Sequence, residues 1–438
     1  MTKILKTILL IAALSSVMLV GCGGGTTSSS AGTIDKDGHI TIEFWYALGG
    51  NSGEVVEEII DQFNQSQSEI TVIGTYQGGY ASSMAKLWNA LSAKTPPAIA
   101  QIGGAPLVGN TGAIVPITDY FEQSGDFDQE AIWDVFWDYN SAGEQIWSMP
   151  FNHSVPMLYY NRDLFISAGL DPDQPPETWD EVIQFGQLLT ADTDDNGEID
   201  QWGFNTRADT HWYLSTMFMQ NGVEIVNSEE TEVLYTSPEA VEMLTLWGDF
   251  VHKHKIMPPN QHDEAKGDFL AGKSGMLLMS SANIPGTIQD APFDVGIAMF
   301  PTIAGKERVV PVGGASLIIL DHDNELIKQA AWTFIEFMGN QESSLYLSIN
   351  TGYLPIYKSA LEWPEMQSYL AENPRRELPI VQLEYAQSIP LFSALGSSDA
   401  QLRVAVEAIE LGTKSPQEAL DHAKEVVDSI ILDNLQDQ

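Results

Sequence analysis

Cysteine is almost missing from the sequence, because Cys22 is the only one among 438 residues. Without a second thiol the chain forms no internal disulfide, so a large hydrophobic core must hold the fold together. Hydrophobic residues make up 44% of the chain and aromatic residues 10%. These fractions are typical of a globular protein and exclude a disordered one.

Positive charge is also scarce. The chain has 20 lysine and arginine residues against 60 aspartate and glutamate residues, which gives a net charge of −40. No basic patch can form against a phosphate backbone, so a nucleic-acid partner is excluded. The acidic residues are spread along the chain and indicate a solvated acidic surface. A high-salt habitat is one explanation, because salt screens the repulsion within such a surface.

Long apolar runs are missing everywhere except at the N-terminus. No later segment approaches the roughly eighteen apolar residues that a membrane-spanning helix needs. At the N-terminus Lys3 and Lys6 precede an apolar run over 8–20 that only Ser15 and Ser16 interrupt. This run is too short to span a bilayer and has the length of a signal-peptide core.

The apolar run ends in Leu19-Val20-Gly21-Cys22, which resembles the cleavage site of bacterial lipoproteins. We therefore predict a signal peptide over 1–21 and a lipid on Cys22 that anchors the exported chain to a membrane. The alternative is a leftover cysteine in an ordinary signal peptide. Residues 23–32 are all glycine, serine, threonine or alanine, so 22–35 is expected to be a flexible tether.

The body of the chain alternates between strand and helix patterns. Strands are expected over 40–45, 70–76 and 98–102, and helices between them over 55–63 and 82–93. This order predicts an α/β fold with a parallel sheet covered by helices, and it places ligands at the carboxyl ends of the strands. About 400 mature residues are too many for one core, so two lobes are expected.

Five motifs are spread in order over the rest of the chain. They are Pro150-Phe151-Asn152, Leu158-Tyr159-Tyr160-Asn161-Arg162-Asp163, Ala168-Gly169-Leu170-Asp171-Pro172 with Pro175-Pro176-Glu177-Thr178-Trp179, Gly313-Gly314-Ala315-Ser316-Leu317 and Thr351-Gly352-Tyr353-Leu354-Pro355. Together they resemble the family 1 extracellular solute-binding proteins of ABC importers, most closely the members that bind glycerol 3-phosphate. The resemblance covers the whole mature chain.

The resemblance implies the two-lobed periplasmic-binding-protein fold (type II). Each lobe then has a mostly parallel sheet flanked by helices, and the ligand binds in the cleft between the lobes. The implied lobes are 36–150 plus 313–353 and 151–312 plus 354–438. The Pro150 segment, the Gly313-Gly314 strand and the Tyr353 turn would be the hinges, since glycine and turn residues tolerate changes in backbone angles.

The resemblance also implies a set of ligand contacts. They are Tyr80, Ser154, Trp212, Ser280, Ser281, the backbone N–H of Gly314, the hydroxyl of Tyr353, and Arg403, which matches an arginine that holds phosphate. One position departs from the family, because Gly104 stands where relatives have the glutamate that grips the glycerol hydroxyls. This change removes a carboxylate and widens the pocket, which makes room for a bulkier glycerophosphodiester or a sugar.

The same residues fit two ligand classes on chemical grounds alone. A guanidinium fork, hydroxyls and a backbone N–H would hold a phosphate. A neutral sugar would use aromatic faces, and the chain has 11 tryptophans and 14 tyrosines. Arg403 has the alternative of pairing with Glu407 one turn further on, and Trp212 that of an ordinary core or surface aromatic.

The segment from Asp192 to Asp200 follows the pattern of a calcium loop, with acidic or amide oxygens at positions 1, 3, 5 and 9 and glycine at position 6. Its candidate ligands are Asp192, Asp194, Asn196 and Asp200. Position 12 is Gly203 instead of the usual bidentate glutamate, so a plain acidic turn is the alternative to a structural calcium site.

Signatures of catalysis are missing as well. The sequence has no Gly-x-Ser-x-Gly, no Gly-x-x-x-x-Gly-Lys-Ser/Thr and no His-Glu-x-x-His motif. We predict that the chain is no enzyme and needs no cofactor beyond the calcium just described. It is expected to be exported to the periplasm or cell surface, to bind a phosphorylated glycerol compound and to deliver it to an ABC permease. An oligosaccharide receptor and a secreted carbohydrate-active hydrolase are the alternatives.

Overall fold

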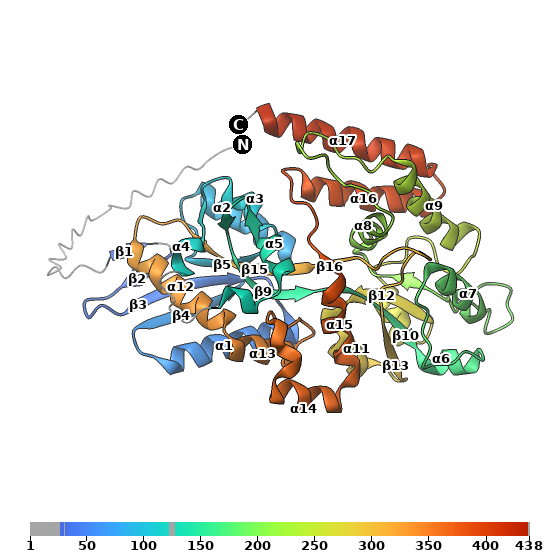
Figure 1. The fold of residues 1–438 in the computed structure, drawn as a ribbon, viewed down its shortest axis with the longest axis horizontal. Helices are drawn as coiled ribbons and strands as arrows, with labels where there is room; N and C mark the ends of the chain where they lie inside the picture. The colour runs from blue at the N-terminus through green and yellow to red at the C-terminus, as the bar shows by residue number, and fades with distance from the viewer. Residues whose placement is uncertain (1–26, 30, 122–127, 437–438) are drawn as a thin grey trace, which may run out of the picture.

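The computed structural model describes residues 27–29, 31–121 and 128–436, and these form two lobes that lie side by side (Figure 1). The predicted signal peptide over 1–21 and the predicted lipid carrier Cys22 lie outside the described residues. Within the described ranges, no helix combines the length and the apolar character that crossing a bilayer requires.

The N-terminal lobe is built on an eight-stranded sheet. Its elements are β1 (Thr27–Ser29), β2 (Gly32–Ile34), β3 (Ile40–Tyr46), α1 (Gly50–Ser66), β4 (Ile70–Tyr76), α2 (Tyr80–Ser92), β5 (Ile99–Ile102), α3 (Ala105–Gly109), β6 (Ile114–Val115), α4 (Thr118–Phe121), α5 (Asp134–Asn140), β7 (Ser141–Ala142), β8 (Gln145–Ile146), β9 (Met149–Ser154), β15 (Gly313–Leu320), α12 (Glu325–Gly339) and α13 (Gln341–Asn350). The strand β3 pairs in parallel with β4 and β5, as the alternating pattern predicts. The helix α1 buries Val55, Val56, Ile59, Ile60 and Phe63 at helical spacing.

The C-terminal lobe is built on a four-stranded sheet with the order β11-β12-β10-β13. Its elements are β10 (Pro156–Asn161), α6 (Arg162–Ser167), α7 (Trp179–Leu189), β11 (Asn205–Thr206), α8 (Thr210–Gln220), α9 (Pro238–His252), α10 (Ala265–Leu270), β12 (Met276–Ser280), α11 (Ile284–Asp290), β13 (Val295–Met299), β14 (Val310–Pro311), α14 (Pro364–Glu372), α15 (Leu378–Val381), β16 (Ala386–Gln387), α16 (Leu395–Glu410) and α17 (Pro416–Gln436). Each lobe has its own hydrophobic core, with Trp332 and Phe334 in the first and Trp247 and Phe250 in the second. The expectation of two lobes is thereby confirmed.

Both sheets are mixed, because each contains a strand that runs against its neighbours. The strand β15 pairs antiparallel with β5, β6 and β9, and β10 pairs antiparallel with β12 and β13. Both strands enter their sheets directly after the chain has crossed between the lobes. The two-lobed α/β architecture is as predicted, but it contains more antiparallel pairs than a mostly parallel sheet implies.

Part of the predicted tether over 22–35 lies in two short strands that the sequence did not predict. The strands β1 and β2 form an antiparallel hairpin, and β2 continues the sheet beside β3. A Cβ atom on Gly32 would lie 2.3 Å from the carbonyl oxygen of Thr41. Glycine therefore allows close approach of two backbones at this position, whereas its composition alone suggested flexibility.

The chain crosses between the lobes at three places that lie next to one another. The first crossing is at Val155, between β9 and β10, and the second is at Val312, between β14 and β15. The third follows α13, where the backbone N–H of Leu354 donates to the carbonyl oxygen of His153 at 2.9 Å. A ring nitrogen of His153 also lies 3.2 Å from the carbonyl oxygen of Gly313, so all three crossings are hydrogen-bonded around this buried histidine.

A buried carboxylate ties the helix α16 to the rest of the C-terminal lobe. Glu410 is 1% exposed and accepts hydrogen bonds from the indole N–H of Trp247 at 2.7 Å and from the backbone N–H of Asn260 at 2.7 Å. A ring nitrogen of His262 lies 2.9 Å from the same carboxylate, and its other ring nitrogen lies 3.0 Å from the carbonyl oxygen of Thr206. A protonated His262 supplies a hydrogen-bond donor at both positions.

Raising the pH is expected to remove part of the stability that this pair contributes. Burial by itself lowers the pKa of His262, but the hydrogen bond and charge of Glu410 outweigh it, so the pKa of the folded state is raised. The contribution is complete below the unfolded-state pKa of about 6.5 and is lost as the pH rises through the folded-state pKa. Melting temperatures of the wild type and of His262→Gln across this range check the prediction, and parallel curves would contradict it.

Candidate functional site

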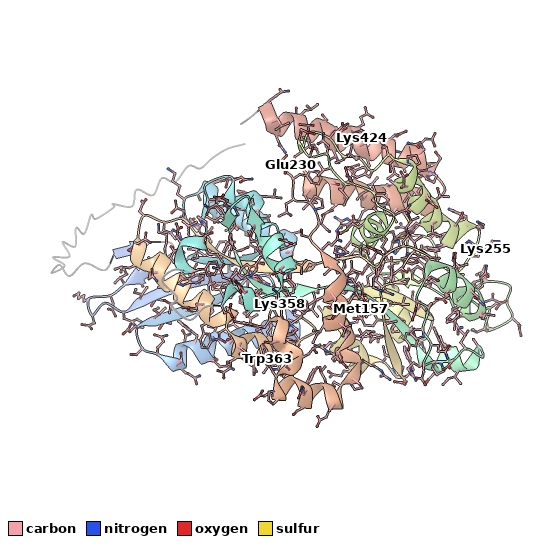
Figure 2. All side chains as sticks on the ribbon, in the orientation of Figure 1. Met157, Glu230, Lys255, Lys358, Trp363 and Lys424 are labelled. Atoms are coloured by element: carbon pink, nitrogen blue, oxygen red, sulfur yellow. The ribbon has the colours of Figure 1, made fainter. Side chains whose placement is uncertain are left out.

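An open cleft of about 1600 Å³ lies between the two lobes. One wall comes from α2, α3 and the end of α5, and the other comes from the starts of α8 and α16 and the end of α17 (Figure 1). The floor is made by the crossing strands, with Ser154 and Gly313 paired across β9 and β15. Figure 2 shows Glu230 at the edge of the C-terminal lobe that faces the N-terminal lobe, and this residue lines the cleft.

Most of the predicted ligand contacts line this cleft. They are Tyr80, Ser154, Trp212, Ser280, Gly314 and Tyr353. These residues come from α2, β9, α8, β12, β15 and the third crossing, so they are far apart in the sequence and adjacent only in the fold.

Two predicted contacts lie elsewhere. Ser281 is fully buried behind Ser280, and its hydroxyl oxygen accepts the backbone N–H of Val155 at 3.3 Å. Arg403 is exposed on α16 and outside the cleft lining, one turn beyond Asp399, which does line the cleft. Among the described residues Arg403 forms no ion pair with Glu407 either. Its charge acts on two lining groups, Asp399 and His211.

The hydroxyls of Tyr80 and Tyr353 lie together at the cleft floor. Tyr80 is 42% exposed, and its hydroxyl oxygen accepts a hydrogen bond from the side-chain amide of Asn152 at 2.7 Å. Although Tyr80 is partly exposed as a residue, its hydroxyl group is buried, and this burial, followed by the neighbouring Tyr353 hydroxyl, raises its pKa. Burial also raises the pKa of Tyr353. Both side chains therefore stay neutral and offer hydroxyls that suit a polar solute.

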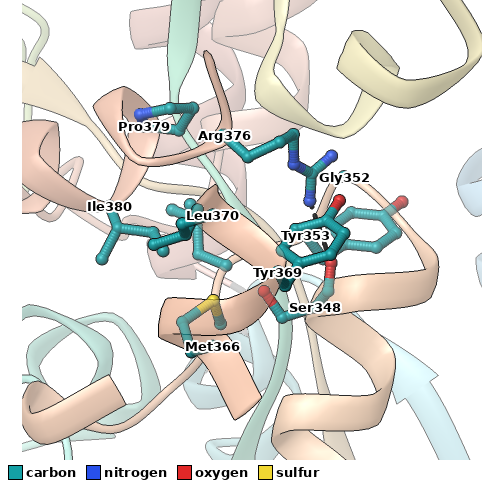
Figure 3. Close-up of a pocket in the computed structure, with 10 residues that line it drawn as sticks. Ser348, Gly352, Tyr353, Met366, Tyr369, Leu370, Arg376, Pro379 and Ile380 are labelled. Atoms are coloured by element: carbon teal, nitrogen blue, oxygen red, sulfur yellow. Dashed lines mark hydrogen bonds between the residues drawn. The ribbon is translucent and has the colours of Figure 1, made fainter. Parts of the chain in front are cut away.

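A buried arginine, Arg376, holds the turn that carries Tyr353. Arg376 donates to the carbonyl oxygens of Ser348 at 2.9 Å and Thr351 at 2.6 Å, and its guanidinium lies 5.8 Å from the centre of the Tyr369 ring. Figure 3 shows Arg376 beside Gly352 and Tyr353, in a small pocket of about 10 Å³ that Tyr353 shares with the cleft. This arginine therefore positions the cleft-lining side chain of Tyr353 and does not itself line the cleft.

Two glycines let an aromatic ring and a backbone segment meet at the floor. The ring of Trp212 packs on Gly313, where a Cβ atom would lie 2.9 Å from the ring carbon Cζ2. Gly314 has a φ of +109°, and a Cβ atom there would lie 2.1 Å from the carbonyl oxygen of Asn152. The carbonyl oxygen of Gly314 accepts the Tyr139 hydroxyl at 3.2 Å. No other residue type fits at Gly314 without moving the hinge strands.

The lining is acidic. Its carboxylates are Asp138, Asp209, Glu229, Glu230 and Asp399, and no described lining residue is a lysine or arginine. Burial lowers the pKa of His211 to about 4, so this lining histidine is neutral near pH 7. Burial raises the pKa of Asp399 to about 6, with Arg403 acting in the opposite direction. The cleft therefore repels a doubly charged anion and accepts neutral or partly cationic solutes.

Gly104 lies in the cleft, at the start of α3. A Cβ atom there would meet only the end of Leu107 at 3.7 Å, so a larger side chain would project into open space. The absence of a carboxylate at this position leaves the cleft wider on this wall. The hydroxyl of Tyr139, which also lines the cleft, interacts with the backbone of Gly104.

Met84 and Trp88 of α2 line the cleft beside Tyr80, but the sequence did not predict them as site residues. Tyr80, Met84 and Trp88 recur every fourth residue and line the cleft, while Leu87 and Ala90 are buried against the lobe. The helix has a second stripe of large apolar residues in addition to the one that packs on the lobe. This second stripe is the sequence signal that would have identified Met84 and Trp88. Tyr139, Asn283 and the lining carboxylates carry no comparable pattern.

The predicted calcium loop has turned its acidic groups inward. The carboxylate of Asp192 accepts the backbone N–H of Gly197 at 2.7 Å. That of Asp200 accepts the hydroxyl of Thr193 at 2.6 Å and its backbone N–H at 2.8 Å, and these bonds lower the pKa of Asp200. Among the described residues no three acidic or histidine side chains cluster closely enough to hold a metal. Calcium binding stays a prediction, and equal melting temperatures in chelator and in excess calcium would contradict it.

Two α/β lobes joined by three crossings, with a polar and aromatic cleft between them, are the architecture of two-lobed solute-binding proteins. The family model described as bacterial extracellular solute-binding protein matches residues 58–374, and the chain belongs to this family. It is the solute-binding component of an ABC importer and not an enzyme, as predicted. Members of this family bind small-molecule ligands and deliver them to ABC permeases.

Relatives with assigned ligands fall into two groups. The sn-glycerol-3-phosphate-binding periplasmic protein UgpB of Salmonella typhimurium is 28% identical, over 87% of this chain and 90% of that protein. The structure of UgpB from Mycobacterium tuberculosis in complex with glycerophosphocholine is 24% identical with a TM-score of 0.80, over 90% of this chain and 99% of that one. The cyclic alpha-maltosyl-1,6-maltose binding protein of Arthrobacter globiformis is 21% identical with a TM-score of 0.76, over the same shares of the chains.

Proposed function

We propose that the chain captures a glycerophosphodiester in the cleft between its lobes and delivers it, as a lipid-anchored subunit, to an ABC permease. The observation that carries this proposal is the meeting of Tyr80, Tyr353, Ser154 and Ser280 with Trp212 on one cleft floor. Neutral hydroxyls bind phosphate and glycerol oxygens, and an aromatic face packs against the carbon skeleton. The similarity to glycerol-3-phosphate-binding relatives over most of both chains supports the same ligand class.

The charge of the lining favours a diester over free glycerol 3-phosphate. A phosphodiester carries one negative charge where the monoester carries nearly two near pH 7, so five lining carboxylates repel it less. If the alcohol on the other side of the phosphodiester carries a positively charged ammonium group, the lining carboxylates and the Trp88 ring attract that group. Glycerophosphocholine, the ligand of the Mycobacterium tuberculosis relative, has this composition.

The phosphate would find donors that carry no full charge. The helices α2 and α16 both begin at the cleft, and neither Gly79 nor Ala394, their N-cap residues, supplies a side-chain cap. At the start of α16 the backbone N–H of Leu395 donates to the carbonyl oxygen of Phe392 at 3.0 Å, so the first backbone N–H groups of α2 are the better placed to donate to an anion. They would act with the hydroxyls of Tyr80 and Tyr353.

An oligosaccharide is the second candidate. Aromatic side chains on both walls, Trp88 and Tyr139 on one and Trp212 on the other, together with lining carboxylates, are a common way to hold a neutral sugar. Solved structures of sugar-binding proteins share the fold, including MalE of Xanthomonas citri with a TM-score of 0.78.

A thermal-shift panel separates the two candidates, because a ligand that binds only the folded state raises the melting temperature. Glycerophosphocholine is expected to raise it, glycerol 3-phosphate to raise it less, and maltotriose to leave it unchanged. If only maltotriose raises the melting temperature, the ligand is a sugar and the glycerophosphodiester proposal is wrong. The panel needs the exported chain without its signal peptide and moderate salt, which screens the −40 net charge.

Replacing Cys22 with alanine is expected to release the protein from the membrane or to leave its signal peptide uncleaved, since one residue would carry the whole anchor. Membrane fractionation of cells that express wild type and Cys22→Ala checks this. A mutant that sediments with the membranes as firmly as the wild type would show that the anchor lies elsewhere.

A further inference from the structure

A buried pair of amide side chains lies directly behind the cleft floor. Gln101 of β5 and Asn152 of β9 are both 0% exposed. The amide nitrogen of Gln101 donates to the amide oxygen of Asn152 at 2.5 Å, and the amide nitrogen of Asn152 donates to the Tyr80 hydroxyl oxygen at 2.7 Å. At the other end, the amide oxygen of Gln101 accepts the backbone N–H of Ala47 at 2.8 Å. These three hydrogen bonds form one network that runs from the end of β3 to the start of α2.

The backbone N–H at the buried end of this network fixes which group donates and which accepts in each hydrogen bond. A backbone N–H can only donate, so Ala47 forces the oxygen of Gln101 to face it and the nitrogen of Gln101 to face Asn152. Asn152 must then turn its oxygen to Gln101 and its nitrogen to Tyr80. Every bond points the same way, and reversing either amide would place two donors or two acceptors against each other.

The consequence reaches the cleft through the tyrosines. The Tyr80 oxygen already accepts a hydrogen bond, so its O–H is left to donate, and the neighbouring Tyr353 hydroxyl is the acceptor within reach. The Tyr353 oxygen lies within reach of both Tyr80 and Asn152 as an acceptor. Its own O–H proton then has no role inside the network and can donate to a bound solute, because Tyr353 lines the cleft.

We propose that Asn152 is a positioning residue that makes the tyrosine pair of the cleft floor a hydrogen-bond donor, so that this point selects a ligand atom that only accepts. A phosphodiester oxygen is such an atom. A sugar hydroxyl can also accept here, but it gains nothing from its own proton. The inference rests on the proposed binding site and adds the polarity of recognition at Tyr353, set by a residue that does not line the cleft.

A double-mutant cycle with glycerophosphocholine as the probe tests the proposal. Asn152→Leu and Tyr353→Phe are each expected to weaken binding roughly ten-fold, the effect of one lost hydrogen bond in a buried site. The double mutant is expected to stay near that level and well short of the roughly hundred-fold loss that independent effects would give. Additive losses would overturn the proposal. If Asn152→Leu fails to fold, Gln101→Met is the substitute variant. It breaks the hydrogen-bond network one bond earlier and should weaken binding to the same extent as Asn152→Leu.

The matched control is Asn205→Leu in the other lobe. Asn205 is 1% exposed and donates to the carbonyl oxygen of Gln261 at 3.3 Å, in β11 and not in the cleft lining. This variant is expected to lose stability and to keep its affinity for glycerophosphocholine within about two-fold, since distant sites act independently. An equal loss of affinity in Asn205→Leu would mean that Asn152 acts only through general stability, and it would overturn the proposal.

A measurement without ligand keeps the inference separate from the proposed function. Hydrogen exchange at the hydrogen-bonded amides that follow Tyr80 in α2, beginning with Ser83, whose N–H donates to the carbonyl oxygen of Gly79 at 2.9 Å, should speed up in Asn152→Leu and stay at the wild-type rate in Asn205→Leu. Unchanged exchange in Asn152→Leu would overturn the positioning role. Wild-type protein that fails to bind glycerophosphocholine, but shows the exchange difference, would count against the proposed ligand and support the network.

Discussion

Alanine at Gly314 is expected to abolish ligand binding and to lower the free energy of unfolding by roughly 2–4 kcal/mol. Two effects add at this position. The φ of +109° is strained for any residue with a Cβ atom, and that atom would lie 2.1 Å from the carbonyl oxygen of Asn152 and 2.9 Å from Cα of His153. The clash is with backbone of another crossing strand, so relief requires β15 to move away from β9.

Denaturant unfolding and calorimetric titration of Gly314→Ala measure the two effects separately. The matched control is Gly286→Ala in α11, where a Cβ atom meets nothing within 4 Å. That variant should be unchanged or stabilised by up to about 1 kcal/mol, because alanine is the better helix former. Gly314→Ala with wild-type stability and affinity would show that the hinge strands shift freely, which contradicts the packing described here.

Truncating Trp212 is expected to weaken binding far more than removing Arg403. The Trp212 ring lines the cleft and packs on Gly313, so Trp212→Ala removes an aromatic face at the centre of the site. Losses of this kind cost roughly 2–4 kcal/mol, or about thirty- to a thousand-fold in affinity. Arg403 is exposed and outside the lining, so Arg403→Ala is expected to cost less than about 1 kcal/mol.

Titration of both variants with the ligand that gives the largest thermal shift decides this order. A loss of several hundred-fold in Arg403→Ala would show that α16 brings its arginine to a phosphate when the lobes close, as the family resemblance implies. In that event Arg403→Lys should recover little, because an ammonium cannot reproduce the bidentate fork.

The elements that the sequence predicted best are those whose signal is local. The helix α1 buries Val55, Val56, Ile59, Ile60 and Phe63 at a spacing visible in the sequence, and the strands β3, β4 and β5 begin and end close to the expected residues. The hairpin of β1 and β2 was missed because its strand residues, apart from Ile34, are glycine, serine and threonine, which have no apolar alternation, and β2 is recognised as a strand only by its pairing with β3.

The residues of the site also differ in how far the sequence alone indicates them. Tyr80, Trp212, Gly314 and Tyr353 lie in segments that resemble a known family, and the structure brings them to one cleft. Asn152 and Gln101 were invisible as site residues because their role depends on a backbone N–H at Ala47, which only the parallel pairing of β3 and β5 brings near. The structure places Arg403 outside the cleft lining because only the first turns of α16 reach the cleft, and Arg403 lies one turn beyond Asp399.

Reversible capture of a glycerophosphodiester between the lobes is the function that we propose. Isothermal titration of glycerophosphocholine into the exported chain, followed by mass spectrometry of the released ligand, tests it most directly. We expect saturable one-to-one binding, recovery of the ligand unchanged, and loss of the binding heat in Trp212→Ala. The absence of binding heat with wild-type protein, or recovery of free glycerol 3-phosphate in place of the diester, would contradict the account.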